Sequence, residues 1–514
     1  MKENKSTFIE AFVTMVLTFV FLIGYQWLSP KVDLLAEHRN FTFFDKVILR
    51  EKLFEQPVLL ARMKTQQDPG VDTLSMESDS LKDNSLVANA NTQSSVAVEV
   101  KEIPLPKVDE PSREKGLGAF FRALDRLERG DKKKIRIGYF GDSMIEGDLI
   151  VMTTRKLFQK KYGGKGVGYL PMHSQTARFR TTVHQYNSKN WDHEDMLFDL
   201  KDHKRPFGIS CENFFVKDSL EATLRLKGSA RMSGLDSLHD LKLFYGNATK
   251  DILKDSLTPT LLTVKVDTVE LGHSLFADKM VNMQRLTEGA HKEIELSISG
   301  VSDSVIFYGV SSDNGEGVIV DNLALRGSSG GQLRFLSPQM LKEFNEIMEY
   351  DLLILQYGTN VCDTSMTNYA WYGRQLRKSI RHLKNHLDDV PVMVVSSGDR
   401  AYKIDGELQT PKGLFFLLEE QRESADKSGA AYFNLFSKMG GDGSMIDWAD
   451  SSPAKANKDY THFNHRGAKQ VGAWIYEFLE EKFAEYKKQK IDNKIKLQKD
   501  SLTHISNPSD SLSN

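Results

Sequence analysis

Residues 135–143 read IRIGYFGDS, and this stretch decides the fold. The first six residues are mostly apolar or β-branched, which favours a strand. Gly141 and Asp142 then form a turn signal directly after it. Ser143 is therefore expected at the end of a strand, where its hydroxyl can face a ligand.

Far downstream, Asp459 and His462 stand three residues apart in the segment DYTH. A serine hydroxyl is a poor nucleophile at neutral pH unless a base takes its proton, and a third group must hold that base in the right tautomer. His462 can serve as the base and Asp459 as the orienting group, from one turn of chain. Together with Ser143, the pair predicts an enzyme.

Strand and helix patterns alternate around these residues. Apolar runs at 352–355 and 392–395 are typical of buried strands, and apolar stripes with helical spacing fall at 149–162, 369–387, 415–425 and 467–486. Continuous apolar strands flanked by amphipathic helices indicate an α/β class with a parallel sheet covered on both faces. Ligands gather at the carboxyl ends of such strands. Two further loops are expected there, RGSSGG at 326–331 and GTN at 358–360.

A different pattern occupies residues 175–322. Segments at 222–227, 262–267 and 293–299 alternate apolar and polar side chains, and Gly, Asp and Asn turns separate them. This spacing predicts an antiparallel β-sandwich inserted into the α/β domain. The predicted α/β domain then comprises residues 114–174 and 323–487.

These blocks resemble the SGNH (GDSL-type) hydrolase superfamily, whose fold is a flavodoxin-like three-layer α/β/α arrangement. Residues 141–143 look like its nucleophile block, 327–330 like its glycine block, 358–360 like its asparagine block and 459–462 like its final Asp/His block. The resemblance implies that Ser143 is the nucleophile, His462 the base and Asp459 its partner. It also implies an oxyanion hole made by the backbone N–H groups of Ser143 and Gly330 and the side-chain amide of Asn360.

The chain departs from the family pattern at two points that matter for the site. Val361 stands where the family usually has an aspartate after the asparagine, although Asp363 is close by. The glycine block offers two donors, and Gly327 remains the alternative to Gly330.

The insert between the first two blocks gives a second, looser resemblance. It is similar to the layout of bacterial peptidoglycan O-acetylesterases and related envelope proteins, in which a carbohydrate-binding-module-like sandwich interrupts the hydrolase domain. This implies a serine esterase that removes O-acetyl groups from an envelope polysaccharide. Two alternatives stay open: an O-acyltransferase that works with a membrane-bound acyltransferase partner, and an inactive glycan-binding or scaffold protein. The esterase interpretation requires no metal or organic cofactor.

The composition gives expectations about the binding partners and the cellular location of the chain. A formal net charge of −2 gives no basic field for nucleic acid. Residues 8–28 form an apolar run of 21 residues, which as a helix spans roughly 30 Å, the thickness of a bilayer core. Residues 1–30 are therefore expected to be a single-pass inner-membrane anchor, with the catalytic domain on the periplasmic or extracellular side. Polar stretches at 31–113 and 488–514 are expected to be a largely disordered tether and tail.

Several other residues have rival interpretations. His465 is the competing base, but no acid stands three residues before it. Glu146 and Asp148 are expected to cap the following helix, where negative charge is favourable. Asp399 and Arg400 could line the pocket or pair with each other. Cys211 and Cys362 match no metal spacing, and the sequence leaves their pairing open.

Overall fold

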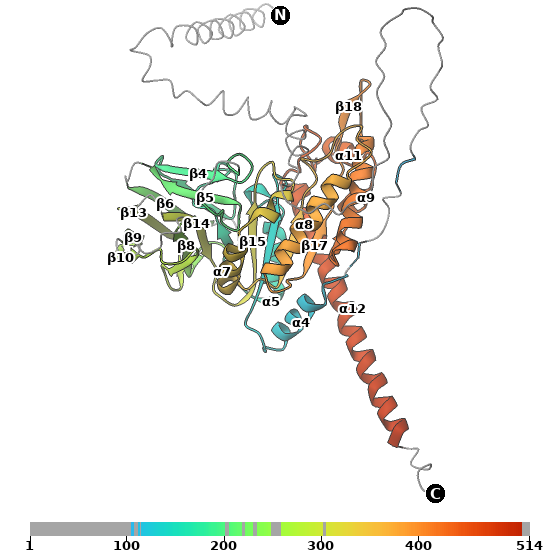
Figure 1. Ribbon diagram of the computed structural model, residues 1–514, viewed down its shortest axis with the longest axis horizontal. Coiled ribbons are helices and arrows are strands. Elements are labelled where there is room, and N and C mark those ends of the chain that lie inside the picture. Colours follow the sequence, from blue (N-terminus) through green and yellow to red (C-terminus); the bar gives the residue numbers. More distant parts are fainter. Residues whose placement is uncertain are drawn as a thin grey trace, which may run out of the picture. The chain divides into compact units, whose positions relative to one another are not determined.

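The computed structural model describes residues 104–106, 112–113, 115–200, 205–217, 221–229, 234–247, 259–301 and 305–505 (Figure 1). They all belong to one compact unit, residues Val96–Asn514. The predicted anchor at 1–30, most of the predicted tether and the end of the predicted tail lie outside these residues. Within the described ranges, no helix has both the length and the apolar content that crossing a bilayer requires.

A five-stranded parallel sheet forms the centre of the α/β domain. Its strands, in spatial order, are β15 (Gly317–Ala324), β1 (Lys134–Gly141), β16 (Leu352–Gln356), β17 (Val392–Val395) and β20 (Ala431–Phe433). All four neighbouring pairs are parallel. Numbered by their order along the chain, the strands run 2-1-3-4-5, the flavodoxin-like order. The direction of winding reverses beside β1, and ligands bind at this point in such folds.

Helices cover both faces of this sheet, as the amphipathic patterns predict. One hydrophobic cluster joins the sheet to α4 (Gly118–Glu128), α5 (Val151–Tyr162) and α12 (His465–Ile505). A second cluster joins the opposite face to α7 (Pro338–Met348), α8 (Ala370–His386) and α9 (Lys412–Lys427). Successive residues of β16 alternate between the two clusters, because side chains of a strand point to opposite faces. The three-layer α/β/α arrangement is therefore confirmed.

Two antiparallel sheets make up the insert. The first has the order β10 (Val269–Leu275), β9 (Thr260–Val266), β13 (Glu293–Ser299), β6 (Ala222–Gly228) and β3 (Val183–Asn187). The second has the order β11 (Asn282–Arg285), β8 (Leu241–Asn247), β14 (Val305–Ser312), β5 (Glu212–Val216) and β4 (Trp191–Asp195), with β2 (Gly168–Leu170) also paired to β14. One hydrophobic cluster contains side chains from both sheets, so they pack as a sandwich. The outer face of the second sheet packs on α7 through Phe344, whose ring lies 5.8 Å from Phe244 and 5.4 Å from Tyr308.

Shorter elements complete the described part of the chain. They are β7 (Leu238–His239) paired with β12 (Ala290–His291), β18 (Tyr402–Ile404) paired with β19 (Glu407–Gln409), α10 (Leu435–Met439), α11 (Ser444–Asp450), and the 3₁₀ turns η2 (Glu146–Asp148) and η4 (Gly331–Phe335).

Two predicted boundaries are placed differently by the structure. The boundary at 322–323 falls inside β15, which pairs with β1 along its whole length and so belongs to the parallel sheet. The predicted disordered tail at 488–514 is wrong over its first part, because α12 continues to Ile505. Residues 488–505 contain no Gly or Pro and many Lys, Gln, Ile and Leu residues, which favour a helix.

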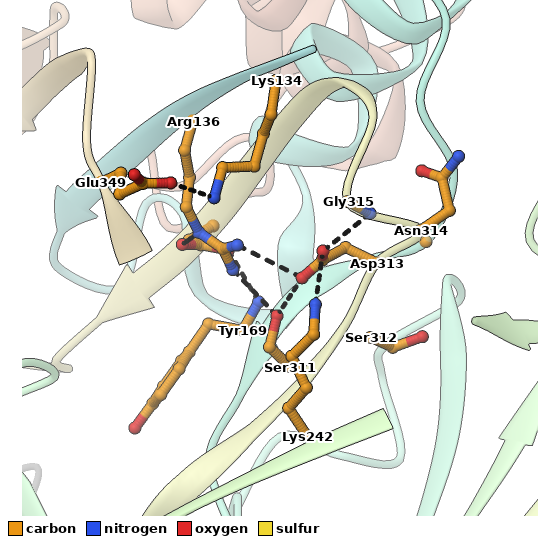
Figure 2. A network of polar contacts seen from close by, with 12 residues as sticks. Lys134, Arg136, Tyr169, Lys242, Ser311, Ser312, Asp313, Asn314, Gly315 and Glu349 are labelled. Atoms are coloured by element: carbon orange, nitrogen blue, oxygen red, sulfur yellow. Dashed lines mark hydrogen bonds and ion pairs between the residues drawn. The ribbon is translucent and has the colours of Figure 1, made fainter. Parts of the chain in front are cut away.

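A buried network of charged groups fastens the insert to the parallel sheet (Figure 2). Arg136 on β1 donates two hydrogen bonds to Asp321 of β15, at 2.7 and 3.0 Å, and one to Asp313 after β14, at 3.2 Å. Lys242 of β8 donates to the other oxygen of Asp313 at 2.8 Å. The side chains of Arg136, Asp313 and Asp321 are at most 3% exposed. Two cations thus balance two anions, and all but Lys242, which is 22% exposed, lie in the interior, where an unpaired charge would be costly.

Candidate active site

Ser143 lies two residues after the end of β1, at the carboxyl edge of the parallel sheet. Its Oγ is 2.9 Å from Nε2 of His462, which is a hydrogen-bond distance. The two residues are 319 positions apart in sequence. The fold therefore brings together the predicted nucleophile and the predicted base.

His462 belongs to the loop between α11 and α12, and Asp459 in the same loop fixes its ring. Nδ1 of His462 is 2.8 Å from Oδ2 of Asp459. The other carboxylate oxygen accepts the backbone N–H groups of Thr461 and His462, both at 3.0 Å. Asp459 is thus held by its own turn, and it leaves Nε2 of His462 directed at Ser143.

The environment of Asp459 keeps its carboxylate ionised. Burial by itself would raise its pKa, but hydrogen bonds from the ring and backbone of His462 and from Thr461 outweigh burial and lower the pKa to about 2. The side chains of His462 and Asp459 are 35% and 49% exposed, so water reaches the pair.

Asn360 lies on the loop after β16, next to the glycine block. Its Nδ2 donates to the backbone carbonyl of Ser328 at 3.0 Å and to Oδ2 of Asp142 at 3.2 Å. Ser328 also accepts the backbone N–H of Gly330 through its hydroxyl, at 3.1 Å. One small network therefore joins the nucleophile, asparagine and glycine blocks. In this state the N–H of Gly330 and both amide hydrogens of Asn360 have acceptors inside the protein.

Gly330 meets two constraints that exclude a side chain. Its φ is +80°, in the left-handed region that favours glycine. A Cβ at this position would lie 2.5 Å from the ring of Tyr357, the residue that follows β16. Gly330 thus allows the glycine block to approach the asparagine loop closely.

Asp142, the residue before Ser143, is fully buried. It accepts hydrogen bonds from the backbone N–H of Met144 at 2.9 Å and from Asn360. Burial raises the pKa of Asp142 to about 6, although the backbone N–H of Met144 and the charges of His462 and Arg400 act in the opposite direction. Asp142 therefore helps to hold the side chain of Asn360.

Other candidate residues lie apart from this geometry. His465 is exposed at the start of α12, and Val361 is buried. Asp363 accepts the backbone N–H groups of Ser365 and Met366, so it closes its own turn. Cys211 and Cys362 are both free thiols.

The expectation that Asp148 caps a helix is wrong. Asp148 is buried and receives two hydrogen bonds from Arg155, at 2.7 and 3.0 Å, and one from Thr182 at 2.8 Å. Local helix-start signals cannot reveal these partners, because they come from a later turn and from the start of the insert. Its neighbour Glu146 forms an ion pair with Arg326 at 2.5 Å.

The side chains of Asp399 and Arg400 are adjacent in sequence but bond to different partners. Asp399 accepts hydrogen bonds from Thr410 at 2.8 Å and from the backbone N–H of Met445 at 2.8 Å, at the start of α11. Arg400 turns instead toward the asparagine loop and donates to the carbonyl of Thr359 at 2.5 Å. Adjacent residues of opposite charge suggest an ion pair, and sequence alone gave no signal for the actual partners. Among the described residues, no group of three or more His, Cys, Asp or Glu side chains is arranged to hold a metal ion.

Comparison with known proteins gives a likeness of structure without a likeness of sequence. No family model matches the chain. No curated protein matches it significantly. A solved structure of a peptidoglycan O-acetylesterase is similar at a TM-score of 0.57 and 18% identity, over 71% of this chain and 96% of that one.

Two further structures overlap with smaller parts of the chain. An acetyl xylan esterase is 14% identical, covering 31% of this chain and 80% of its own, and a candidate GDSL-like lipase from Parabacteroides merdae is 16% identical, covering 31% and 71%. Both have TM-scores of 0.24, too low to carry weight. At 18% identity, the similarity to the peptidoglycan O-acetylesterase structure shows a common fold and nothing beyond it. With the 2-1-3-4-5 parallel sheet and the four blocks gathered at its carboxyl edge, the chain therefore shares the fold of this peptidoglycan O-acetylesterase structure.

Proposed function

We propose that the chain is a serine esterase that hydrolyses O-acetyl esters on a cell-envelope polysaccharide. The observation that carries this proposal is the continuous series of hydrogen bonds from Ser143 Oγ through His462 to Asp459, with spacings of 2.9 and 2.8 Å. The series lies at the sheet edge where ligands of this fold class bind.

In the proposed reaction, Ser143 Oγ attacks the carbonyl carbon of the ester while Nε2 of His462 takes the hydroxyl proton. The carbonyl π electrons move to the oxygen, and the tetrahedral intermediate expels the sugar alkoxide, which receives the proton from His462. Water then attacks the carbonyl carbon of the acetyl-serine while His462 takes a proton from it. The tetrahedral intermediate expels the Ser143 oxygen, which receives that proton from His462. Acetate leaves and the Ser143 hydroxyl is restored.

The oxyanion would be met by the N–H groups of Ser143 and Gly330 and by the Asn360 amide. Removing one such donor typically costs about 10²–10³ in kcat. Because Asn360 and Gly330 already donate to protein acceptors, the substrate oxygen must compete for these hydrogens or share them. Gly327 remains the alternative backbone donor.

Two features support an acetylated glycan as substrate. The peptidoglycan O-acetylesterase structure matches the chain over a span long enough to include parts of both the α/β domain and the insert. The sandwich also resembles a carbohydrate-binding module in its two antiparallel sheets. The apolar run at 8–28 supports an inner-membrane anchor, with the catalytic domain on the periplasmic or extracellular side.

Hydrolysis is favoured over acyl transfer by the exposure of the site. His462 and Asp459 are more than one third exposed, so water has access to the acyl-enzyme, and an acceptor sugar would have to exclude it. Product analysis with an acetyl donor, with and without a glycan acceptor, separates the two reactions. Transfer to the acceptor in preference to water would replace the esterase proposal.

The decisive experiment is labelling of the full chain with a serine-reactive fluorophosphonate, comparing wild type with Ser143→Ala and His462→Ala. We expect labelling of the wild type alone, accompanied by release of acetate from O-acetylated peptidoglycan. A wild-type chain that is folded but neither labelled nor able to hydrolyse an acetyl ester would reject the proposal and favour the inactive glycan-binding alternative.

A further inference from the structure

Arg400 lies at the carboxyl edge of the parallel sheet, five residues after the end of β17. Its guanidinium contacts two loops that carry site residues. Nη1 donates to the backbone carbonyl of Thr359 at 2.5 Å, and Nη2 is 3.5 Å from the hydroxyl of Thr461. Thr359 precedes Asn360, and Thr461 precedes His462. One side chain thus touches the neighbours of the oxyanion-hole amide and of the base.

The surroundings of Arg400 hold it in this orientation. Its guanidinium lies 4.4 Å from the ring centroid of Tyr402, as in a cation–π contact. The next residue, Ala401, donates its backbone N–H to the carbonyl of Tyr460 at 2.9 Å. Asp399 is occupied by Thr410 and Met445, so it does not compete for the guanidinium. Backbone and side chain therefore both fasten the β17 loop to the loop of His462.

Among the described residues, no hydrogen bond runs directly from the 358–362 loop to the 459–462 loop. Asn360 follows β16 and His462 precedes α12, so different elements position them. Their relative placement must be accurate, because both act on the same carbonyl group in the proposed reaction. Arg400 therefore adds a second connection to the one that runs through Asp142 and Ser143.

The structure leaves one donor of Arg400 unused. Its Nε is shielded from solvent and has no hydrogen-bond acceptor among the described residues. A buried donor without a partner is unfavourable, so the arginine is not explained by local stability alone. A lysine would avoid this cost, but its single ammonium group lacks the planar fork that reaches two loops in fixed directions.

We infer that Arg400 is a positioning residue, which fixes the Asn360 amide and the His462 imidazole relative to each other around the reacting carbonyl. This inference rests on the proposed esterase function. Arg400 acts through its two neighbouring loops, and no contact with substrate is assigned to it.

The test uses full-length Arg400→Ala and Arg400→Lys, with Arg377→Lys as the matched control. Arg377 is a partly buried arginine of α8 that donates to Glu420 and Ser424, away from the site. For an acetyl ester, kcat is measured per active site, with the sites counted by fluorophosphonate labelling. Counting sites removes any loss that comes from unfolded protein.

We expect Arg400→Ala to lower kcat about 10–100-fold with KM changed less than about threefold, since misplacement by a fraction of an ångström to 1 Å has effects of this order. Arg400→Lys should recover only a small part of the loss, and added ethylguanidinium should partly restore Arg400→Ala. Arg377→Lys should keep the wild-type kcat. Thr461→Val, which removes the weaker of the two contacts, should fall between wild type and Arg400→Ala.

The outcomes separate this inference from the function on which it rests. If wild type hydrolyses the ester and Arg400→Ala keeps kcat per labelled site within twofold, Arg400 is structural and the inference fails, while the esterase proposal stands. Full recovery in Arg400→Lys would also overturn it, because charge alone would then suffice. If wild type is folded but inactive, the proposed function fails first.

Discussion

The two ends of β1 use charge in opposite ways. Near its start, Arg136 is 3% exposed and is enclosed by Asp321, Asp313 and Ser311. Beyond its end, Ser143 meets a histidine and an aspartate that are 35% and 49% exposed. The same strand therefore carries a network closed to water and a chain of hydrogen bonds open to it.

The two ends of β1 differ in the hydrogen-bond partners that their ionisable side chains have. At the buried end, burial would lower the pKa of Arg136, but the two carboxylates raise it above its usual value, so the ion stays charged and fully paired. At the open end, Nε2 of His462 has a hydroxyl as its partner and can exchange a proton with it. We therefore expect substitutions at the buried end to cost stability and substitutions at the open end to cost activity.

The largest effect is expected for Ser143→Ala. Removing the proposed nucleophile should lower ester hydrolysis by about 10⁴-fold or more, the usual cost when a serine hydrolase loses its nucleophile. The free energy of unfolding should change by less than about 1 kcal/mol, because the side chain is only half-buried. Acetate release and urea unfolding measure the two quantities.

Ser188→Ala is the matched control for this loss. Ser188 is a half-buried serine of the sandwich that accepts one backbone hydrogen bond, from Thr223 at 3.0 Å. It should keep full activity. A Ser143→Ala variant that loses as much stability as activity would erase the distinction between the two ends of β1.

Arg136→Met should give the largest loss of stability. Breaking a buried ion pair by removing one partner typically costs about 3–5 kcal/mol, because Asp321 and Asp313 are left charged in the interior. Urea unfolding should show the loss. Adding Asp321→Asn should recover part of it, whereas equal stabilities of Arg136→Met and wild type would show that the network carries no net energy.

The fold was largely predictable where the pattern was local. The apolar runs of β1, β16 and β17 each form a complete signal, and so do the alternating strands β6, β9 and β13. Strand β15 was placed in the insert because nothing in its own residues distinguishes a strand that pairs with β1 from one that pairs with β14. The three-residue strand β20 is too short for any periodicity.

The site was predictable to the extent that its chemistry is carried by short motifs. Ser143, Asp459, His462 and Asn360 each stand in a block with a recognisable local pattern. Ser328 was given no separate role, and Arg400 was expected only to line the pocket or to pair with Asp399, because their actual partners lie 32 and up to 61 positions away in sequence. Only the folded chain shows that the carbonyl of Ser328 holds Asn360, or that Arg400 joins two loops.

Asn360→Ala should lower kcat about 10²–10³-fold, the usual cost of one oxyanion-hole donor. KM should change little, since the contact strengthens as negative charge develops on the carbonyl oxygen. Steady-state kinetics on an acetyl ester measures both. The control is Asn345→Ala on α7, whose amide bonds Asp388 and the backbone of Tyr350 and should affect stability alone. A kcat within threefold of wild type would remove Asn360 from the oxyanion hole.

Titration of Asp142, just after the end of β1, should make the free energy of unfolding depend on pH. Burial raises its pKa from 3.8 to about 6, so the protonated form favours folding. This contribution is fully present below pH 3.8 and is lost as the pH rises through about 6. It amounts to about 3 kcal/mol, at about 1.4 kcal/mol for each factor of ten in the acid dissociation constant.

The test compares Asp142→Asn with wild type by urea unfolding at several pH values. The variant cannot titrate, so its free energy of unfolding relative to wild type should rise by up to about 3 kcal/mol between pH 4 and pH 7.5. Asp148→Asn is the control. Burial would raise the pKa of Asp148, but Arg155 and Arg180 lower it to about 2, so its difference from wild type should stay flat above pH 4. A flat difference for Asp142→Asn as well would show that Asp142 is charged throughout this range.

The smallest effect is expected for Lys487→Met, which breaks an ion pair between α12 and α4. Lys487 lies 2.9 Å from Glu128, nearly the spacing found in the buried network, but the two side chains are 38% and 28% exposed. Water screens such pairs, and the loss should stay below about 1 kcal/mol and shrink further in 0.5 M salt. Urea unfolding at low and high salt gives both values. If Lys487→Met cost as much as Arg136→Met, distance rather than burial would set the energy of these pairs, and the contrast between the two ends of β1 would need another cause.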